Sequence, residues 1–174
     1  MTAVASPTGT ASALRRLYFV RFGFAVVWAA LLIATMDLGP ASKVLLVLYP
    51  LFDVAAAVVD ARSSRTRGLY VNIAISLLAA AALAIASGVP AALTVWGVWA
   101  IVAGLVQLVV GVGRRGMGGQ WPMILSGGIS VLAGSSFIAM ANGESPSLSA
   151  LAGYATIGGI FFLVSALRLK VTAP

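Results

Sequence analysis

The sequence predicts an all-α, polytopic integral membrane protein whose six transmembrane helices form three repeated hairpins. Three observations lead to this fold class: the apolar composition, the length of the apolar stretches and the placement of the basic residues between them. Hydrophobic residues make up 61% of the 174 positions, charged residues make up 9%, and the mean hydropathy is +1.07. In soluble domains roughly a quarter of the residues are charged. A soluble globular domain is therefore excluded.

Six apolar stretches are each long enough to cross a membrane, which takes about 20 helical residues. They cover residues 17–36, 42–59, 68–87, 91–112, 120–141 and 147–167. Lipid offers the backbone no hydrogen-bond partner, so spans of this length are helices rather than strands. We expect one membrane domain over residues 14–170, preceded at residues 1–13 by a disordered cytoplasmic tail rich in Ser, Thr and Ala.

The basic residues alternate with the spans and predict the orientation. Ten of them lie at the start of the first span, in the second-to-third and fourth-to-fifth connections, or after the last span: Arg15, Arg16, Arg21, Arg62, Arg65, Arg67, Arg114, Arg115, Arg168 and Lys170. Only Lys43 lies on the opposite side. Basic short loops stay cytoplasmic, so both termini are expected inside. This placement accounts for the net charge of +7 without a nucleic-acid partner and favours contact with anionic lipid at the cytoplasmic face.

The outer turns indicate an internal threefold repeat. The proline of each outer turn precedes an inner basic residue by 22, 24 and 22 positions, in the pairs Pro40–Arg62, Pro90–Arg114 and Pro146–Arg168. Hairpins that all begin and end inside are parallel repeats around an axis along the membrane normal. The short turn Gly88-Val89-Pro90 predicts a tight hairpin of spans three and four. An aromatic residue on the inner side begins each odd-numbered span, namely Tyr18, Tyr70 and Trp121, which predicts an interfacial aromatic belt.

Small residues recur every seven positions on the fourth and fifth spans. The helix-packing candidates are Gly97, Gly104 and Gly111 on the fourth span, and Gly127 and Gly134 on the fifth. Small residues let helices approach closely in lipid, and a seven-residue spacing favours left-handed crossings. We expect these glycines to pack helices rather than to bind a ligand.

Charged side chains inside a bilayer are costly and by default indicate function, which makes Asp53 in the middle of the second span the most informative residue. Asp60 lies seven residues later on the same helix face. Arg21 lies about one turn into the first span, at a depth between the two carboxylates, so it is expected to pair with Asp60 or with Asp53. The pair is either a structural lock on the first hairpin or part of a proton or ion pathway.

Two other buried polar residues could join such a pathway, Asn72 and Gln107, although interhelical hydrogen bonds are their commoner role. Pro50 is expected to kink the second span three residues before Asp53 and to free a carbonyl group.

The residues that most enzymes use are missing. The chain contains no Cys and no His, which removes disulfides, thiolate metal sites and the commonest acid–base group. The G-x-G-x-x-G pattern at residues 111–116 follows no strand, so it does not indicate a dinucleotide site. We therefore expect no enzymatic activity, no cofactor and no metal site.

The chain has six short-looped spans in three hairpins, an aromatic residue at the start of each odd span, the turn Gly88-Val89-Pro90 and the stretch from Trp121 to Gly128 (WPMILSGG). In these features it resembles the HdeD-like acid-resistance membrane proteins. The resemblance covers roughly residues 14–170. It implies an inner-membrane protein whose enterobacterial namesake is linked to survival in acid at high cell density, and it supplies no catalytic residue or cofactor.

From the sequence we expect a non-enzymatic, stress-related or scaffolding membrane protein of this type. The alternative is a small transporter or channel that moves protons or a small solute, using Asp53 with Arg21. A transporter should show a polar cavity that reaches Asp53, whereas a structural protein should bury Asp53 against Arg21. The sequence leaves open whether the chain forms a homo-oligomer or binds another membrane protein.

Overall fold

The computed structural model describes residues 7–35, 39–64 and 66–169. Within these ranges the chain forms six α-helices and one 3-10 turn: α1 (Pro7–Thr35), α2 (Gly39–Ser64), α3 (Gly68–Ile85), α4 (Gly88–Gly113), η1 (Arg115–Met117), α5 (Trp121–Ala141) and α6 (Ser149–Arg168). Each α-helix contains a segment that is long and apolar enough to cross a membrane. The prediction of an all-α, multi-pass membrane protein is therefore confirmed.

Two helices extend well beyond the expected spans. Helix α1 begins at Pro7, so residues 7–13 are helical rather than part of a disordered tail, and residues 1–6 lie outside the described residues. The extension is stabilised by packing, because the buried side chains of Ala11 and Leu14 contact Leu169 after the end of α6. Helix α2 continues five residues beyond the expected end, to Ser64. The other boundaries lie within a few residues of the prediction.

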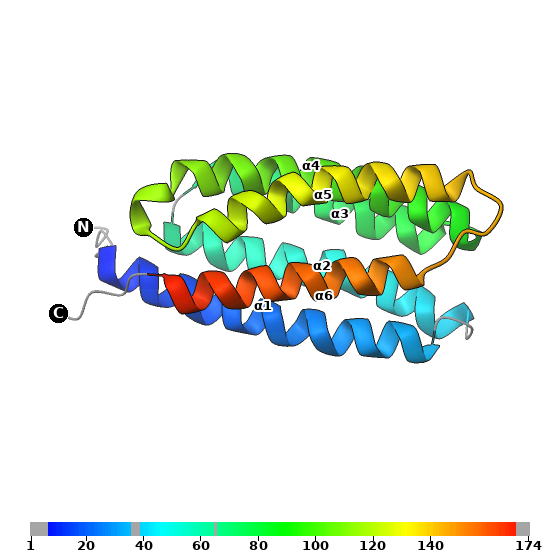
Figure 1. The fold of residues 1–174 in the computed structure, drawn as a ribbon, viewed down its shortest axis with the longest axis horizontal. Helices are drawn as coiled ribbons and strands as arrows, with labels where there is room; N and C mark the ends of the chain where they lie inside the picture. The colour runs from blue at the N-terminus through cyan, green and yellow to red at the C-terminus, as the bar shows by residue number, and fades with distance from the viewer. Residues whose placement is uncertain (1–6, 36–38, 65, 170–174) are drawn as a thin grey trace.

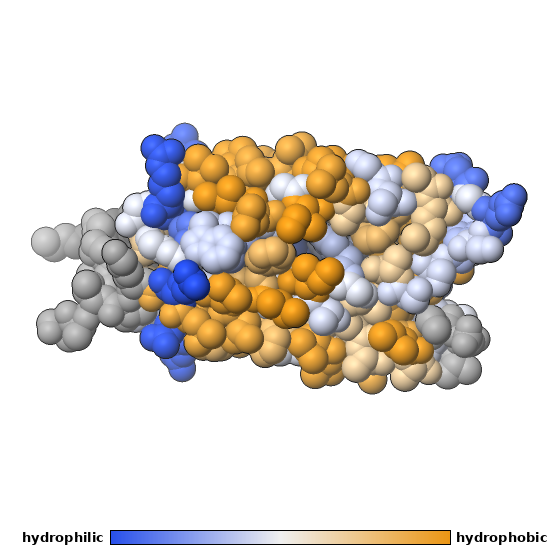
Figure 2. Space-filling view, viewed as in Figure 1, coloured by the Kyte–Doolittle hydropathy of each residue, from blue (hydrophilic) through white to orange (hydrophobic). Residues whose placement is uncertain are grey.

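The helices lie side by side along the long axis of the molecule (Figure 1). Helix α1 begins and α6 ends at one end of the bundle, where the α2–α3 and α4–α5 connections also lie; we call this the basic end and its opposite the far end. The exposed arginines of the basic end are Arg15, Arg16, Arg62, Arg67, Arg115 and Arg168. Hydrophilic residues gather at both ends of the surface, with a predominantly apolar band between them (Figure 2).

Each helix packs against its neighbours in the sequence, and α1 also packs against α6, so the six helices form a closed ring. The contacts alternate around this ring. The extensive pairs are α4–α5, α1–α6 and α2–α3, whereas α3–α4, α1–α2 and α5–α6 contact each other less. Only Ala86 and Ser87 separate α3 from α4, so the tight turn expected between spans three and four is present. The most extensive packing lies elsewhere, at the glycine seam between α4 and α5. The threefold repeat itself stays a prediction.

The seam between α4 and α5 is built on the glycines that recur every seven residues. Gly97 faces Gly134, and Gly104 faces Gly127 about two turns closer to the basic end. A Cβ atom placed on Gly134 would lie 2.5 Å from the carbonyl oxygen of Gly97, closer than any side chain tolerates. Gly111 continues the line, with its nearest atoms on Ile124. These glycines set the close approach of the two helix backbones.

Aromatic side chains fill the far half of the bundle. The rings of Trp28, Tyr49, Trp96 and Trp99 contact one another, with centroids 4.7–5.9 Å apart. The indole Nε1 of Trp28 donates to the carbonyl oxygen of Leu45, on the turn of α2 that precedes Pro50. Tyr49 and Trp99 of this cluster also line the polar cavity described below.

Candidate functional site

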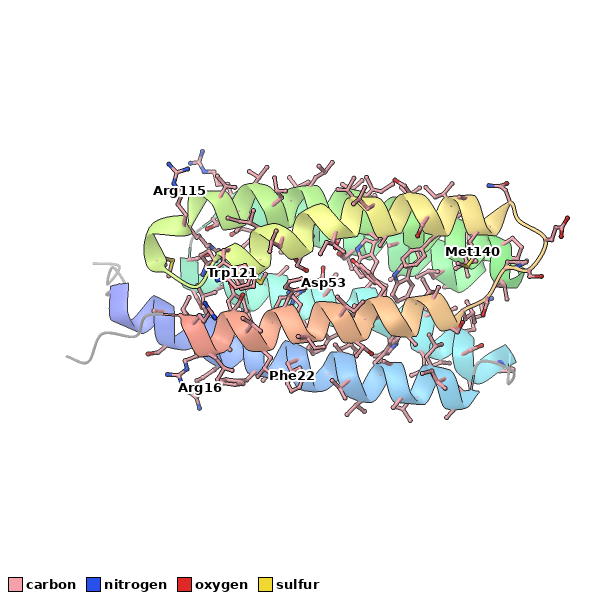
Figure 3. The ribbon with its side chains drawn as sticks, viewed as in Figure 1. Arg16, Phe22, Asp53, Arg115, Trp121 and Met140 are labelled. Atoms are coloured by element: carbon pink, nitrogen blue, oxygen red, sulfur yellow. The ribbon has the colours of Figure 1, made fainter. Side chains whose placement is uncertain are left out.

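Asp53 is a buried carboxylate in the middle of α2, with 4% of the residue exposed (Figure 3). Its Oδ1 atom forms a salt bridge with Nη2 of Arg21 on α1. Its Oδ2 atom accepts hydrogen bonds from Nδ2 of Asn72 at 2.6 Å and from Oγ of Ser76 at 2.9 Å, both on α3. The buried charge is thus paired and fully hydrogen-bonded, which is the condition under which a low-dielectric interior tolerates it.

The polar residues converge because each occupies the inward face of its own helix. Asp53 and Asp60 belong to the buried stripe of α2, and Asn72 and Ser76 are one turn apart on the buried stripe of α3. Trp99 of α4 extends the network, since its Nε1 donates to Oγ of Ser76 at 2.9 Å. Four helices, α1 to α4, are therefore connected through a single carboxylate.

Arg21 has a second partner on α6. Its guanidinium carbon lies 4.3 Å from the centroid of the Phe162 ring, a distance typical of a cation–π contact. The side chain of Arg21 is 17% exposed, compared with 6% for that of Asp53. The cation is therefore held on two sides, by a carboxylate and by an aromatic face.

Asp60 pairs with Arg114 rather than with Arg21. Nη1 of Arg114 donates to Oδ2 of Asp60 at 2.9 Å and Nη2 to Oδ1 at 2.7 Å, a bidentate geometry. Nη2 also donates to the hydroxyls of Ser64 and Thr66. Burial alone would lower the pKa of Arg114, but its hydrogen bonds and charge attraction to Asp60 outweigh burial and raise that pKa. The second buried ion pair therefore lies at the basic end.

A cavity of about 90 Å³ joins the two ion pairs. Its charged lining residues are Arg21, Asp53, Asp60 and Arg114, and its polar lining includes Tyr18, Tyr49, Tyr154, Asn72, Gln107, Gln120, Ser126 and Ser130. A polar cavity of this size has room for several water molecules. Figure 2 shows a small hollow in the surface between α5 and α6, the pair with the least mutual contact among the neighbours in the ring. On that side Oη of Tyr154 donates to Oγ of Ser130 at 2.8 Å and bridges the two helices.

The sequence-predicted polar residues all line this cavity, with different partners. Arg21 pairs with Asp53, one of the two expected partners, and Asn72 binds the same carboxylate. Gln107 lines the cavity too, but its Nε2 donates to the carbonyl oxygen of Met123 and joins α4 to α5. The bundle therefore meets both expectations for Asp53, a buried pair with Arg21 and a polar cavity.

Several residues of the site were not predicted from the sequence. Arg114 counted only as a loop charge, although it is buried against Asp60. Tyr18, expected in an interfacial belt, is 3% exposed and lines the cavity, whereas Tyr70 and Trp121 are exposed as expected. Ser76 carried one usable signal, its position four residues after Asn72 on the same face. Nothing in the sequence pointed to Trp99.

No known family model, curated protein or solved structure matches this chain. The function must therefore be inferred from the site itself. Within the described ranges, no three acidic residues gather closely enough to hold a metal ion. The chemistry available to the cavity is that of two carboxylates, two guanidinium groups, and the hydroxyls and amides around them.

We expect Arg114→Gln to lower the free energy of unfolding by about 3 kcal/mol, because the buried Asp60 carboxylate loses its counter-charge. The matched control is Arg115→Gln, the same change at the next residue, whose side chain is exposed and points away from the bundle (Figure 3). That control should stay within about 0.5 kcal/mol of the parent. Equilibrium unfolding of both variants in mixed micelles measures the difference. Equal losses would contradict the assigned pair.

Proposed function

We propose that this protein is a non-enzymatic plasma-membrane protein that moves protons, alone or with a small solute, through the cavity between its two ion pairs. Asp53 is the proton acceptor, and Arg21 is its counter-charge. The observation that carries the proposal is the polar cavity that reaches Asp53 in the middle of α2. A purely structural ion pair needs no water-sized space beside it, whereas a carboxylate that exchanges protons does.

The placement of the charges supports a path towards the basic end. The cavity extends from Tyr49 and Trp99 in the aromatic cluster to Asp60, Arg114 and Gln120 beside the basic-end connections. Both termini are proposed to be cytoplasmic, because nearly all basic residues lie at this end. Exposed arginines there would also attract anionic lipid head groups, by roughly 1 kcal/mol for each charge near the surface.

A structural role in acid or general stress, of the kind implied by the resemblance to HdeD-like proteins, is the second candidate. The observation that favours it is the complete hydrogen bonding of both carboxylates: Asp53 links α1 to α3, and Asp60 links α2 to the residue after α4. A scaffold of this kind would keep its ion pairs closed and would pass no protons.

Proton flux separates the two candidates. Purified protein is reconstituted into liposomes that contain a pH-sensitive dye and potassium chloride, with valinomycin present so that charge movement does not limit the flux. We expect an external acid pulse to acidify these liposomes faster than protein-free ones. Asp53→Asn should reduce the rate to that of protein-free liposomes, while its circular dichroism spectrum and elution volume stay unchanged.

The matched control is Glu144→Gln, which neutralises an exposed carboxylate in the α5–α6 connection at the far end. This variant should acidify at the parental rate. A parental rate equal to that of protein-free liposomes, or an Asp53→Asn rate equal to the parental one, would contradict the proposal and favour the structural role.

A further inference from the structure

The charges around the cavity cancel, and this neutrality restricts what the site can take up. Among the described residues, two carboxylates and two guanidinium groups line the cavity. A proton that binds Asp53 turns its carboxylate into a neutral acid and leaves Arg21 as an unpaired cation in a poorly solvated interior. An unpaired buried charge is strongly unfavourable. A proton is therefore accepted far more readily when an anion enters with it.

Arg21 is the cation that is free to receive that anion. It gives Asp53 a hydrogen bond from one terminal nitrogen, and its guanidinium group is also held by the Phe162 ring. Arg114, in contrast, uses both terminal nitrogens on Asp60 and binds two hydroxyls besides. Loss of the Asp53 charge would leave Arg21 in place with several N–H donors facing the cavity.

The partners of Asp53 can adapt to its neutral form. Asn72 donates through its amide nitrogen, and a rotation of that amide would present its oxygen as an acceptor for a carboxylic acid proton. The Ser76 hydroxyl can likewise turn and accept, because its oxygen has a second lone pair besides the one that receives Trp99. When Asp53 takes up a proton, the new O–H group can therefore face an acceptor on Asn72 or Ser76 rather than another hydrogen-bond donor.

No other titratable group in the site supplies the missing negative charge at neutral pH. The titratable groups that line the cavity besides Asp53 and Arg21 are Tyr18 from α1, Tyr49 and Asp60 from α2, Arg114 after α4 and Tyr154 from α6. The described lining residues of α3 and α5 carry only amide, hydroxyl and apolar groups. The tyrosines are neutral phenols. Asp60 is already engaged by Arg114.

We propose that the cavity takes up one proton together with one small monovalent anion, the proton on Asp53 and the anion on Arg21. This inference rests on the proposed proton movement. The carboxylate–guanidinium pair plus a proton and an anion becomes a carboxylic acid plus a guanidinium–anion pair, so the net charge of the site stays zero. Release of both restores the salt bridge. The volume of about 90 Å³ limits the anion to the size of chloride, nitrate or another ion of a few atoms.

Coupling of proton and anion movement is tested by repeating the flux assay with and without valinomycin. The medium on both sides contains either chloride or the large anion gluconate. We expect acidification in chloride to be unaffected by valinomycin, and acidification in gluconate to fall to the rate of protein-free liposomes. Acidification that is indifferent to the anion and accelerated by valinomycin would overturn the coupling and leave proton movement intact. A lack of acidification in every medium would overturn the proton movement and the coupling together.

Anion binding has a readout that does not depend on flux. Asp53→Asn mimics the neutral acid and leaves Arg21 available, so its melting temperature should be higher in chloride than in gluconate at equal ionic strength. The double variant Arg21→Gln/Asp53→Asn and the parent at neutral pH should show no such difference. An Asp53→Asn protein that melts at the same temperature in both salts, or a double variant that keeps the chloride effect, would overturn the assignment of the anion to Arg21.

Discussion

Arg21→Met will lower the free energy of unfolding by about 3–5 kcal/mol, because it leaves the Asp53 carboxylate buried without a counter-charge. Asp53 is 4% exposed, so bulk solvent does not reach it, and neutral water in the cavity supplies no counter-charge. Asp53→Leu should cost a similar amount, since Arg21 then keeps its charge beside Phe162 and the amide of Asn72 loses its acceptor. Equilibrium unfolding in mixed micelles measures both losses.

The double variant Arg21→Met/Asp53→Leu completes the cycle. Replacing both members of a buried ion pair by apolar residues of similar size is often close to neutral, so the double variant should be more stable than either single variant. It should also conduct no protons. Two single losses that simply add in the double variant would show that the two side chains do not interact, which would contradict the central ion pair.

Gly97→Ala will separate α4 from α5 and lower stability by about 2–3 kcal/mol, at the upper end of what overpacking costs. The added Cβ atom would lie 2.6 Å from the carbonyl oxygen of Gly134 and 2.7 Å from Cγ1 of Ile138. The first of these contacts is with backbone, which cannot rotate away. Because α4 and α5 form the most extensive helix pair, the loss should appear as a lower melting temperature and a smaller yield of folded protein.

The matched control for Gly97→Ala is Gly153→Ala, the same substitution within α6. An added Cβ atom there meets nothing within 4 Å, so no contact opposes it. Alanine is a better helix former than glycine by about 1 kcal/mol in soluble hosts, so this variant should match or exceed the parent in melting temperature. A Gly97→Ala protein that melts with the control would contradict the close approach of the two helices.

The six spans and the glycine pattern were readable from the sequence because they depend on length, apolarity and a fixed period. A helix that crosses lipid must be about 20 apolar residues long, and a seven-residue repeat of Gly97, Gly104 and Gly111 places small residues on one face. The helix that packs against this glycine face could not be predicted from the sequence. Which helices pack most extensively depends on side chains from both helices, and a single sequence does not pair them.

The candidate site, like the fold, could be predicted from the sequence only in part. Asp53 stood out because a charge within an apolar span must be accommodated, and Arg21 followed from its depth in the neighbouring helix. Arg114 did not stand out, because a basic residue in a loop already has an explanation in membrane topology. Its pairing with Asp60 depends on the continuation of α2 to Ser64, five residues beyond the expected end.

The measurement that tests the proposed proton path most directly is the access of a small water-soluble cation to a cysteine introduced into the cavity. The natural chain has no cysteine, so the introduced thiol is the only one that can react. Ser126 lines the cavity, whereas its neighbour Leu125 is exposed on the outer surface of α5. We expect silver ions, applied in nitrate medium, to bind the thiol of Ser126→Cys and stop proton flux, and to leave the flux of Leu125→Cys unchanged. Silver that fails to reach the thiol of Ser126→Cys, or that binds there without reducing the flux, would contradict a proton path through this cavity.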